Sequence, residues 1–434
     1  MSAPQLRPTA PPSGSTPPTR RSSFAALRHR DFRLLWVGQF ISITGSQMQL
    51  LAINWHVYLL TKSAFALGLV GLVRVVPIIL CSLLGGVVAD AVDRRRLIVA
   101  TQIVMLASAA ILAIVTASGL KSVWPIYALT AISSAAVAFD NPARQSLLPT
   151  LVPAKDFPNA VSLGLVAFQV ATVTGPALAG LLLGFYSPAI IYAANAASFL
   201  AVIVAVLLIR AGRRSEKENA EASKISFEAL GEGLRFVWRT PIIVQTMTLD
   251  FIATFFASAT ALLPIFADRI LHVGARGLGI LAASPAAGAV VAGLIMARLG
   301  SAAMRKPGAV IIGSIAVYGA ATIAFGFSKL FWLSLLMLAL TGAADTVSTV
   351  LRQTIRQLVT PDNLRGRMTS VNMMFFMGGP QLGELEAGAV ASVFGAQLSV
   401  ITGGVGCLIA VALATFGAKH LLNYKSAAID TAKQ

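Results

Sequence analysis

Long apolar runs separated by short polar breaks dominate the chain from residue 34 onward. Twelve runs come near or exceed the length of about 20 residues that lets a helix cross a hydrocarbon core of about 30 Å. They are 34–60, 66–89, 97–119, 123–139, 161–185, 189–209, 242–266, 278–297, 309–327, 330–350, 371–396 and 398–417. Because lipid offers the backbone no hydrogen-bond partner, such a segment has to be helical. The pattern predicts an all-α membrane protein with twelve transmembrane helices.

The longest polar break, residues 210–241, divides the predicted helices six and six. Its second part is patterned as an amphipathic helix at the membrane surface, and a solvated linker is the alternative. The apolar side of that helix comprises Phe227, Leu230, Leu234, Val237 and Trp238. The predicted domains are a disordered cytoplasmic tail at 1–33, an N-terminal bundle at 34–209, the cytoplasmic link at 210–241, a C-terminal bundle at 242–418 and a second cytoplasmic tail at 419–434.

Composition excludes the soluble protein classes. Hydrophobic residues make up 56% of the chain and charged residues 12%, whereas soluble proteins carry roughly 25% charged residues. The net charge of +17 would fit a nucleic-acid-binding protein only if the basic residues gathered on one soluble surface. They lie instead in the breaks between apolar runs, so no nucleic-acid partner is predicted. Cys81 and Cys407 fall inside apolar runs and the four histidines are not spaced as ligands, so no metal or cofactor is predicted.

The basic residues also predict the orientation of the chain. With both termini in the cytoplasm, 28 Lys and Arg residues fall on the cytoplasmic side and five on the opposite side, while Arg74 lies inside the membrane. The five are Lys62, Lys121, Arg269, Arg276 and Lys329. By the positive-inside rule this distribution predicts cytoplasmic termini. A bacterial inner membrane is the expected location.

An internal repeat relates the two halves. A shift of 208 residues, without a gap, places residues 144–180 on residues 352–388 with eight identities in 37 positions. The matches include Arg144 with Arg352, Pro153 with Pro361 and Gly175 with Gly383, and Pro77 meets Pro285. Duplicated halves predict two pseudo-symmetric six-helix bundles. In transporters built in this way the substrate site lies at the interface between the repeats.

The break between the second and third helices carries a motif, GGVVADAVDRRRLIV. Gly86 and Asp90 precede three arginines, at 94 to 96. The motif resembles the loop of the major facilitator superfamily, although Ala91 replaces the usual basic residue and Asp93 the usual glycine. The resemblance implies a cytoplasmic gate of ion pairs that break and form during transport. The gate would comprise Gly86, Asp90, Arg94, Arg95, Asp140, Arg144 and Arg352. A purely topological role for the arginines is the alternative.

Three further segments resemble one branch of that superfamily. They read FDNPARQSLLPTLVP after the fourth helix, LDFIATFFASATALLPIFA in the seventh and QLGELEAGAVASVFGA in the eleventh. The branch includes enterobactin exporters and macrolide efflux proteins. The resemblance implies export of bulky amphipathic molecules, driven by the proton gradient.

Five ionisable residues lie deep in the predicted spans, where a charge costs about 2.5–3.5 kcal/mol on insertion scales. Arg74 and Glu384 are at similar depth on the second and eleventh helices, so we expect an ion pair between the bundles, with Glu386 as the competing partner. Asp250 stands among phenylalanines and is the expected site for a proton or a cationic substrate. Asp345 ranks lower because it lies nearer the cytoplasmic end and could pair with Arg352.

Small and polar residues complete the expected site. Gly175, Pro176 and Gly180 in the fifth helix predict close helix packing and a soft bend. Expected cavity-lining residues are Gln39, Gln47, Asn54, Phe251 and Phe255. Three aromatic residues near the ends of the first helix are expected in interfacial belts, namely Trp36, Trp55 and Tyr58.

These features favour a proton-coupled exporter working by alternating access. An importer or facilitator of a small solute is the first alternative, and a non-transporting membrane receptor is the second. Motifs of metalloproteases, serine hydrolases and phosphate-binding loops are missing from the sequence, so no enzyme activity is predicted. The expected partners are a small-molecule substrate, protons and the lipid bilayer, and a monomer is expected.

Overall fold

The computed structural model describes residues 24–210, 234–256, 260–303, 305–361 and 364–417. Within these ranges it leaves out the side chains of 83–87, 89–91, 300–303, 365–367, 369–371, 373–377 and 416–417. The first half comprises η1 (Ala25–Arg28), α1 (Arg30–Thr61), α2 (Ala64–Ala91), α3 (Arg94–Ala117), α4 (Trp124–Leu151), η2 (Ala154–Asp156), α5 (Phe157–Leu183) and α6 (Pro188–Leu208). The second comprises α8 (Pro241–Phe256), η3 (Thr260–Leu262), α9 (Leu263–Ile265), η4 (Phe266–Ile270), α10 (Gly274–Ala303), α11 (Pro307–Phe327), α12 (Phe331–Val359), α13 (Arg365–Phe394) and α14 (Ala396–Gly417).

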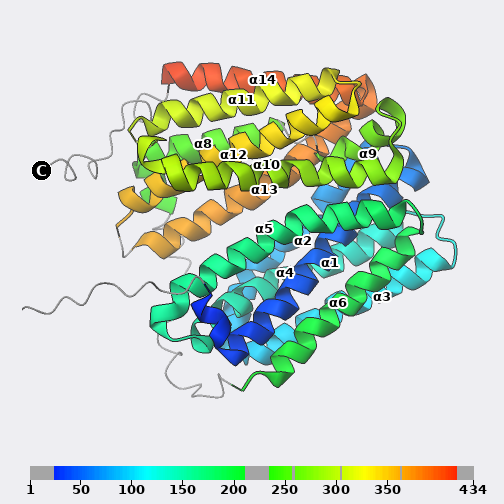
Figure 1. Ribbon diagram of the computed structural model, residues 1–434, viewed down its shortest axis with the longest axis vertical. Helices are drawn as coiled ribbons and strands as arrows, with labels where there is room; N and C mark the ends of the chain where they lie inside the picture. The colour runs from blue at the N-terminus through cyan, green and yellow to red at the C-terminus, as the bar shows by residue number, and fades with distance from the viewer. Residues whose placement is uncertain (1–23, 211–233, 257–259, 304, 362–363, 418–434) are drawn as a thin grey trace, which may run out of the picture.

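The predicted two-bundle, all-α membrane fold is confirmed. Figure 1 shows α1 to α6 in one bundle and α8 to α14 in a second. Among the described residues, nine helices are long and apolar enough to cross a membrane. The others that complete the twelve are α1, α4 and α13, whose sequences contain more polar residues.

The helix boundaries repeat after 208 residues in the later part of each half. The first residues of α5 and α13, Phe157 and Arg365, are separated by this number, and so are those of α6 and α14, Pro188 and Ala396. Because the same spacing separates the ends of α4 and α12, a residue from this point onward has a defined counterpart in the other half, whereas α1 and α8 begin 211 residues apart.

Two predicted boundaries were wrong. Helix α1 begins at Arg30, four residues before the predicted start at 34. Residues 24–29, placed in the tail by the sequence, are fixed because Asn159 accepts a hydrogen bond from the backbone N–H of Ala26, and His29 pairs with Asp156 at 2.9 Å. The fourth helix, predicted for 123–139, continues to Leu151. Its polar residues find partners inside the bundle, so they do not end the helix.

The predicted seventh helix, 242–266, is interrupted in the structure. Helix α8 ends at Phe256, and the described chain resumes in η3, α9 and the π-helical turn η4. Pro264 has no N–H to donate, which disfavours a continuous α-helix through this segment. The π turn carries Asp268 to the end of the bundle, and π turns of this kind are frequent at functional sites.

The two bundles meet at one end and diverge toward the end where α6 stops and α8 starts (Figure 1). Helix α2 packs against α13, and α5 packs against α10. Glycines allow these close approaches, because a Cβ on Gly180 would lie 2.5 Å from the Cα of Gly279, and one on Gly388 would lie 2.8 Å from the Cα of Gly68. We call this contact region, which holds residues 58–71, 176–184, 262–281 and 381–396, the closed end.

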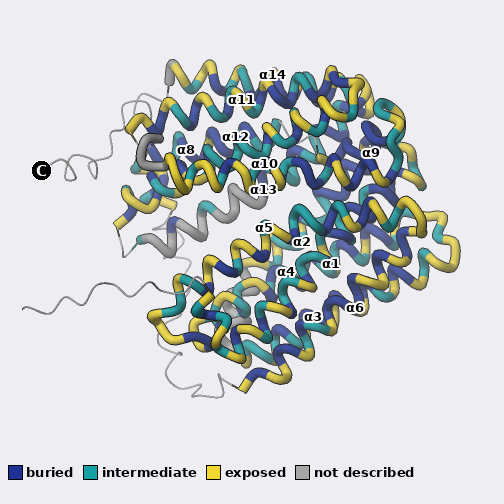
Figure 2. Tube along the Cα trace, in the orientation of Figure 1, coloured by how far each residue is buried: buried dark blue, intermediate teal, exposed yellow. Residues whose placement is uncertain are grey.

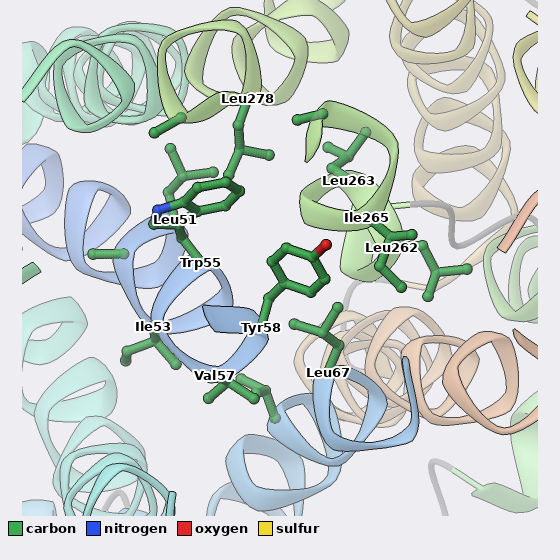
Figure 3. Packing of buried hydrophobic residues seen from close by; sticks show 14 of the residues in the cluster. Leu51, Ile53, Trp55, Val57, Tyr58, Leu67, Leu262, Leu263, Ile265 and Leu278 are labelled. Carbon is green, nitrogen blue, oxygen red and sulfur yellow. The ribbon is translucent and has the colours of Figure 1, made fainter. Parts of the chain in front are cut away.

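Buried residues line the faces between helices, and exposed apolar residues cover the outside, as expected for a surface in lipid (Figure 2). One buried cluster joins the two halves at the closed end, where Tyr58 and Leu67 pack with Leu262 and Leu278 (Figure 3). The expectation of an interfacial position for Trp55 and Tyr58 was wrong, since both are buried between the bundles.

Candidate functional site

The C-terminal half contains a buried cluster of charges around Arg352. Nη2 of Arg352 lies 2.6 Å from Oδ1 of Asp250, which projects from α8, and 3.7 Å from Oδ1 of Asp345, about two turns earlier on α12. The guanidinium also donates to the hydroxyls of Ser348 and Thr349, at 2.8 and 2.9 Å. Arg352 is only 1% exposed. One buried cation is therefore shared between two carboxylates from different helices.

A small cavity with both apolar and hydroxyl-bearing walls adjoins this cluster. It has a volume of about 130 Å³ and is lined by Asp345 together with the hydroxyl-bearing residues Thr260, Tyr318, Thr322 and Thr341. The Asp345 side chain is 46% exposed, whereas that of Asp250 is 9% exposed. Of the two carboxylates, Asp345 is thus the one that solvent or a small polar group can reach. A cavity of this size and polarity suits water or a small polar substituent.

The N-terminal half has a corresponding charge pair on one helix. Asp140 and Arg144, four residues apart on α4, form an ion pair, and both side chains are largely buried. Oδ1 of Asp140 also accepts hydrogen bonds from Thr101 and Gln102 of α3, at 2.9 and 3.1 Å. The sequence placed these two residues at the end of a helix, but the structure places them inside α4. Like Arg352, they lie within a bundle and contact their own half.

Arg74 and Glu384 lie on helices that face each other, α2 and α13, as the sequence suggested. The carboxylate of Glu384 interacts electrostatically with Arg74 and accepts a hydrogen bond from Thr260. Its carboxylate lies against α2, because a Cβ on Gly71 would lie 2.7 Å from Glu384 Oε2. In the described part of the chain the two side chains form no ion pair within 4 Å, so a direct pair in this conformation is not formed. Glu386, the competing partner, is half-buried and has no described ion pair either.

The motif between α2 and α3 is described only in part. Gly86 and Asp90 lie on the last turns of α2 and their side chains fall outside the described residues. Arg94 donates to the carbonyl of Ser146 at 3.2 Å. Arg95 donates to the carbonyl of Ile209 at 2.9 Å. Both bonds stay inside the N-terminal half.

Asp93 explains how the motif tolerates the loss of its usual glycine. Its φ of −52° is open to any residue, and its carboxylate accepts hydrogen bonds from the backbone N–H groups of Arg95 and Arg96. Asp93 is therefore the N-cap of α3, a position at which aspartate is strongly preferred.

A polar contact joins the two halves at the closed end. The hydroxyl of Tyr58, on α1, donates to Oδ2 of Asp268 on η4 at 2.5 Å. Nζ of Lys62 lies 3.6 Å from the same oxygen and 4.3 Å from the centre of the Tyr58 ring. Figure 3 shows the Tyr58 ring directed at the segment that carries Leu263 and Ile265. We call Tyr58, Lys62 and Asp268 the closed-end lock.

Backbone strain accompanies this lock. Among the described residues, the non-glycine residues with positive φ are Lys62, at 49°, and His272, at 51°, and they flank the lock on either half. Such conformations cost of order 1–3 kcal/mol and cluster at switch regions. Sequence reasoning missed Asp268 because it treated the seventh helix as continuous. The available signal was the position of Asp268 directly before Arg269, one of the five basic residues on the sparsely charged side.

The expected packing and lining residues occupy defined interfaces. A Cβ on Gly175 would lie 2.5 Å from Cβ of Gln47, so α5 and α1 pack closely there. Pro176 lies inside α5, and its carbonyl approaches Gly279 of the other half. Phe251 and Phe255 stack with ring centres 5.9 Å apart and lie against α13. Gln39 and Asn54 are half-buried on α1. Among the described residues no group of His, Cys, Asp and Glu could hold a metal ion.

Comparison with known proteins gives a consistent result. A protein family described as transmembrane secretion effector matches residues 21–432. The enterobactin exporter EntS of Shigella boydii serotype 18 is 24% identical over 381 residues, which cover 88% of this chain and 90% of that protein. EntS of Escherichia coli O81 matches to the same extent.

Solved structures resemble this one over nearly the whole chain. A bacterial homologue of the human lysosomal transporter Spinster, in an inward-facing and unoccupied conformation, has a TM-score of 0.71 at 15% identity and covers 91% of this chain and 98% of its own. The nucleoside transporter NupG has a TM-score of 0.66 at 14% identity and covers 91% of this chain and 100% of its own. At these identities the likeness shows the fold.

Proposed function

The chain belongs to the transmembrane secretion effector family of the major facilitator superfamily, and we propose that it is a proton-coupled exporter of small amphipathic molecules. Membership makes it a multi-pass membrane transporter. Direction, coupling ion and substrate are the proposed part. The observation that carries the proposal is the sharing of Arg352 between Asp250 and Asp345.

Charge balance links this cluster to protons. Arg352 forms the ion pairs with both carboxylates, whereas Arg356, also buried on α12, donates to Asn372. A buried carboxylate that loses its pair with Arg352 is favoured to take up a proton. When Asp250 takes up a proton, Arg352 is released to Asp345, and the connection between α8 and α12 weakens. Because the same segment of chain that begins with α8 carries Asp268 of the closed-end lock, we expect protonation of Asp250 to affect the contact between the halves. Glu384 and Glu386, on α13, are further candidate proton sites in this scheme.

The distribution of basic residues supports placing the closed end on the outer side of the membrane. The closed end holds Lys62, Arg269 and Arg276 of the five cations on the sparsely charged side. With the termini in the cytoplasm, this conformation is closed outside and its bundles diverge toward the cytoplasm. A cytoplasmic substrate would bind between the bundles, close to Gln39, Asn54, Phe251 and Asp345. The gate of Asp90, Arg94, Arg95, Arg144 and Arg352 would then close behind it. We propose that the transporter works as a monomer.

Similarity to an enterobactin exporter supports a siderophore-like or drug-like substrate. Aromatic side chains beside carboxylates and hydroxyls can hold a molecule that has apolar rings and polar substituents. Phe251 directly follows Asp250, and its ring stacks with that of Phe255, so the two rings supply such a surface.

The test is energised efflux from cells that lack their own exporters. Cells are loaded with a catecholate siderophore or one of a panel of lipophilic drugs, and efflux is measured with and without an uncoupler. We expect uncoupler-sensitive export of one compound class. Asp250→Asn should abolish uphill export and retain downhill exchange, because the binding site persists without its proton carrier. The matched control is Asp140→Asn, which removes the carboxylate of the other half and should retain uphill export.

Two results would contradict the proposal. Entry of a polar solute down its gradient, without export of any compound, would favour an importer or facilitator. Equal losses in the Asp250 and Asp140 variants would remove the special role of the C-terminal cluster.

A further inference from the structure

A groove of about 590 Å³ runs between α8 and α14 on the outside of the C-terminal half. Its walls are almost entirely apolar, and Gln245 and Thr248 are the polar residues among those that line it. Both helices are long and apolar enough to cross the membrane. The groove therefore opens into the hydrocarbon of the bilayer, which restricts its occupant to a molecule with an apolar chain.

The corresponding place in the N-terminal half is closed. Ile409 and Leu413 of α14 are 55% and 67% exposed in the groove, whereas Ala205, the counterpart of Leu413 on α6, is 4% exposed. There α1 covers α6 directly. The groove is thus a specific feature of one half and not a general property of this pair of helices.

Two glycines account for the difference. A Cβ on Gly38 of α1 would lie 3.0 Å from the carbonyl oxygen of Ala201, and one on Gly45 would lie 2.5 Å from Oγ of Ser198. Gly406, the counterpart of Ser198, meets Phe256, so Phe256 takes the place of Gly45 in the second half, and Leu249, seven residues earlier, takes the place of Gly38. Both residues line the groove, and their larger side chains keep α8 further from α14 than α1 is from α6. Contact between these helices returns at Phe256, whose ring would lie 3.0 Å from a Cβ on Gly406 and closes the deep end of the groove.

The open end of the groove adjoins a basic, aromatic segment. Residues 234–239 form a helical turn just before α8, with Arg235 and Arg239 exposed and Trp238 69% exposed. Val237 is buried against the bundle and fixes this turn beside α8. Exposed tryptophan and arginine next to a membrane span are typical of the lipid headgroup level. Arginines at that level attract anionic lipids.

We propose that this groove is a binding site for an anionic phospholipid, with one acyl chain between α8 and α14 and the phosphate at Arg235 and Arg239. The depth of the groove fits one leaflet. From Val244 to Phe256 the helix rises about 18 Å at 1.5 Å per residue, close to half of a hydrocarbon core of about 30 Å. The site does not depend on the direction or coupling of transport. With the orientation proposed above, the lipid belongs to the cytoplasmic leaflet.

The experiment measures lipid binding to the purified full-length chain by native mass spectrometry. Delipidated protein is titrated with phosphatidylglycerol or with phosphatidylcholine of the same acyl chains. We expect phosphatidylglycerol to bind about tenfold more tightly, because two basic residues contact its headgroup. The double variant Arg235→Gln and Arg239→Gln should remove that preference. Arg33→Gln, an exposed arginine near the start of α1 in the half without a groove, is its matched control and should keep it.

A second pair of variants tests the acyl chain. Ala410→Leu fills the groove and should lower binding of both lipids, whereas Ala412→Leu makes the same change on an exposed face of α14 outside the groove and should have no effect. Equal affinity for the two lipids in the unaltered protein would overturn the proposal. The proposal would also be overturned if Ala410→Leu and Ala412→Leu changed lipid binding equally, or if neither of them changed it.

Discussion

The two halves of the molecule hold a buried arginine at equivalent positions, but they neutralise it differently. Arg144 pairs with Asp140 on the same helix. Arg352, 208 residues later, has Ser348 at the position of Asp140 and takes its carboxylate from Asp250 on α8. The aspartate therefore lies on the same helix as the arginine in the first half and on a neighbouring helix in the second.

This difference changes what the ion pair can do. A pair within one helix moves with that helix, so its energy is the same whatever the neighbouring helix does. A pair between α8 and α12 depends on how these helices sit against each other, and it weakens if either moves. The C-terminal pair can couple protonation to movement, whereas the N-terminal pair holds α4 and α3 together through Thr101 and Gln102. The predictions below test this difference.

The largest effect should come from removing the arginines themselves. Arg352→Met leaves the buried carboxylate of Asp250 and the more exposed one of Asp345 without their ion pair, and breaking a buried pair in this way costs about 3–5 kcal/mol. Arg144→Met should cost less, because Asp140 keeps two hydrogen bonds from α3 and the Arg144 side chain is 13% exposed. Unfolding of both variants in the same detergent gives the comparison. Equal loss of stability would show that the second carboxylate adds nothing.

A double exchange should convert the C-terminal pair into the N-terminal type. Asp250→Ser with Ser348→Asp moves the carboxylate onto α12, four residues before Arg352, and copies the arrangement around Arg144. Because the arginine keeps a partner, we expect stability to fall by no more than about 1–2 kcal/mol, on the scale of a typical substitution. Uphill transport should fall at least about tenfold, equivalent to 1.4 kcal/mol, while downhill exchange continues.

The control for this exchange is Ser348→Asp alone. It adds a third carboxylate to the cluster without removing Asp250, so its effect separates added charge from altered connectivity. If the doubly exchanged protein transported substrate uphill as well as the unaltered protein, the ion pair between α8 and α12 would be unnecessary for coupling transport to protons.

The comparison also shows what the sequence could predict. Twelve apolar runs and the 208-residue repeat were sufficient for the fold, because helix length and hydrophobicity are local properties. The residues around Arg352 were partly identified, since a buried charge in a span is visible in one dimension. Its pairing with Asp250 was not, because it depends on which face of α8 meets α12. Ser348, four residues before Arg352, is a signal that a partner had to come from elsewhere.

A smaller effect is expected at the polar contact that joins the halves, the closed-end lock. Asp268→Asn weakens the acceptor of Tyr58 and removes the charge that Lys62 faces. Because the Asp268 side chain is 39% exposed, we expect a loss of about 1 kcal/mol and not the full value of a buried charged hydrogen bond. The closed end should then open about fivefold more often.

Cysteine labelling can measure that opening. Cys81 and Cys407 are the only cysteines in the sequence, so two substitutions give a background without thiols. A single cysteine at Leu67, buried at the closed end, should react faster with a polar thiol reagent in the Asp268→Asn protein. Lys121→Gln, which changes a charge on the same side outside the lock, is the control. Unchanged reactivity would mean that apolar packing alone holds the halves together.

The smallest effect on stability is expected at the N-terminal ends of α3 and α11, where the two halves differ in how the helix is capped. Helix α3 is capped by the Asp93 side chain, whereas its counterpart α11 follows Lys306, which makes no capping hydrogen bond, and starts with Pro307. Asp93→Ala should therefore destabilise the protein by about 1 kcal/mol, and Lys306→Ala by much less, since proline at the first helical position is already suited to the helix start. Thermal unfolding of both variants tests this, and Asp93→Asn should recover most of the loss because asparagine is an equally good cap. A loss of transport in Asp93→Ala without a loss of stability would instead assign Asp93 to the gate, and the departure from the usual glycine would then be functional.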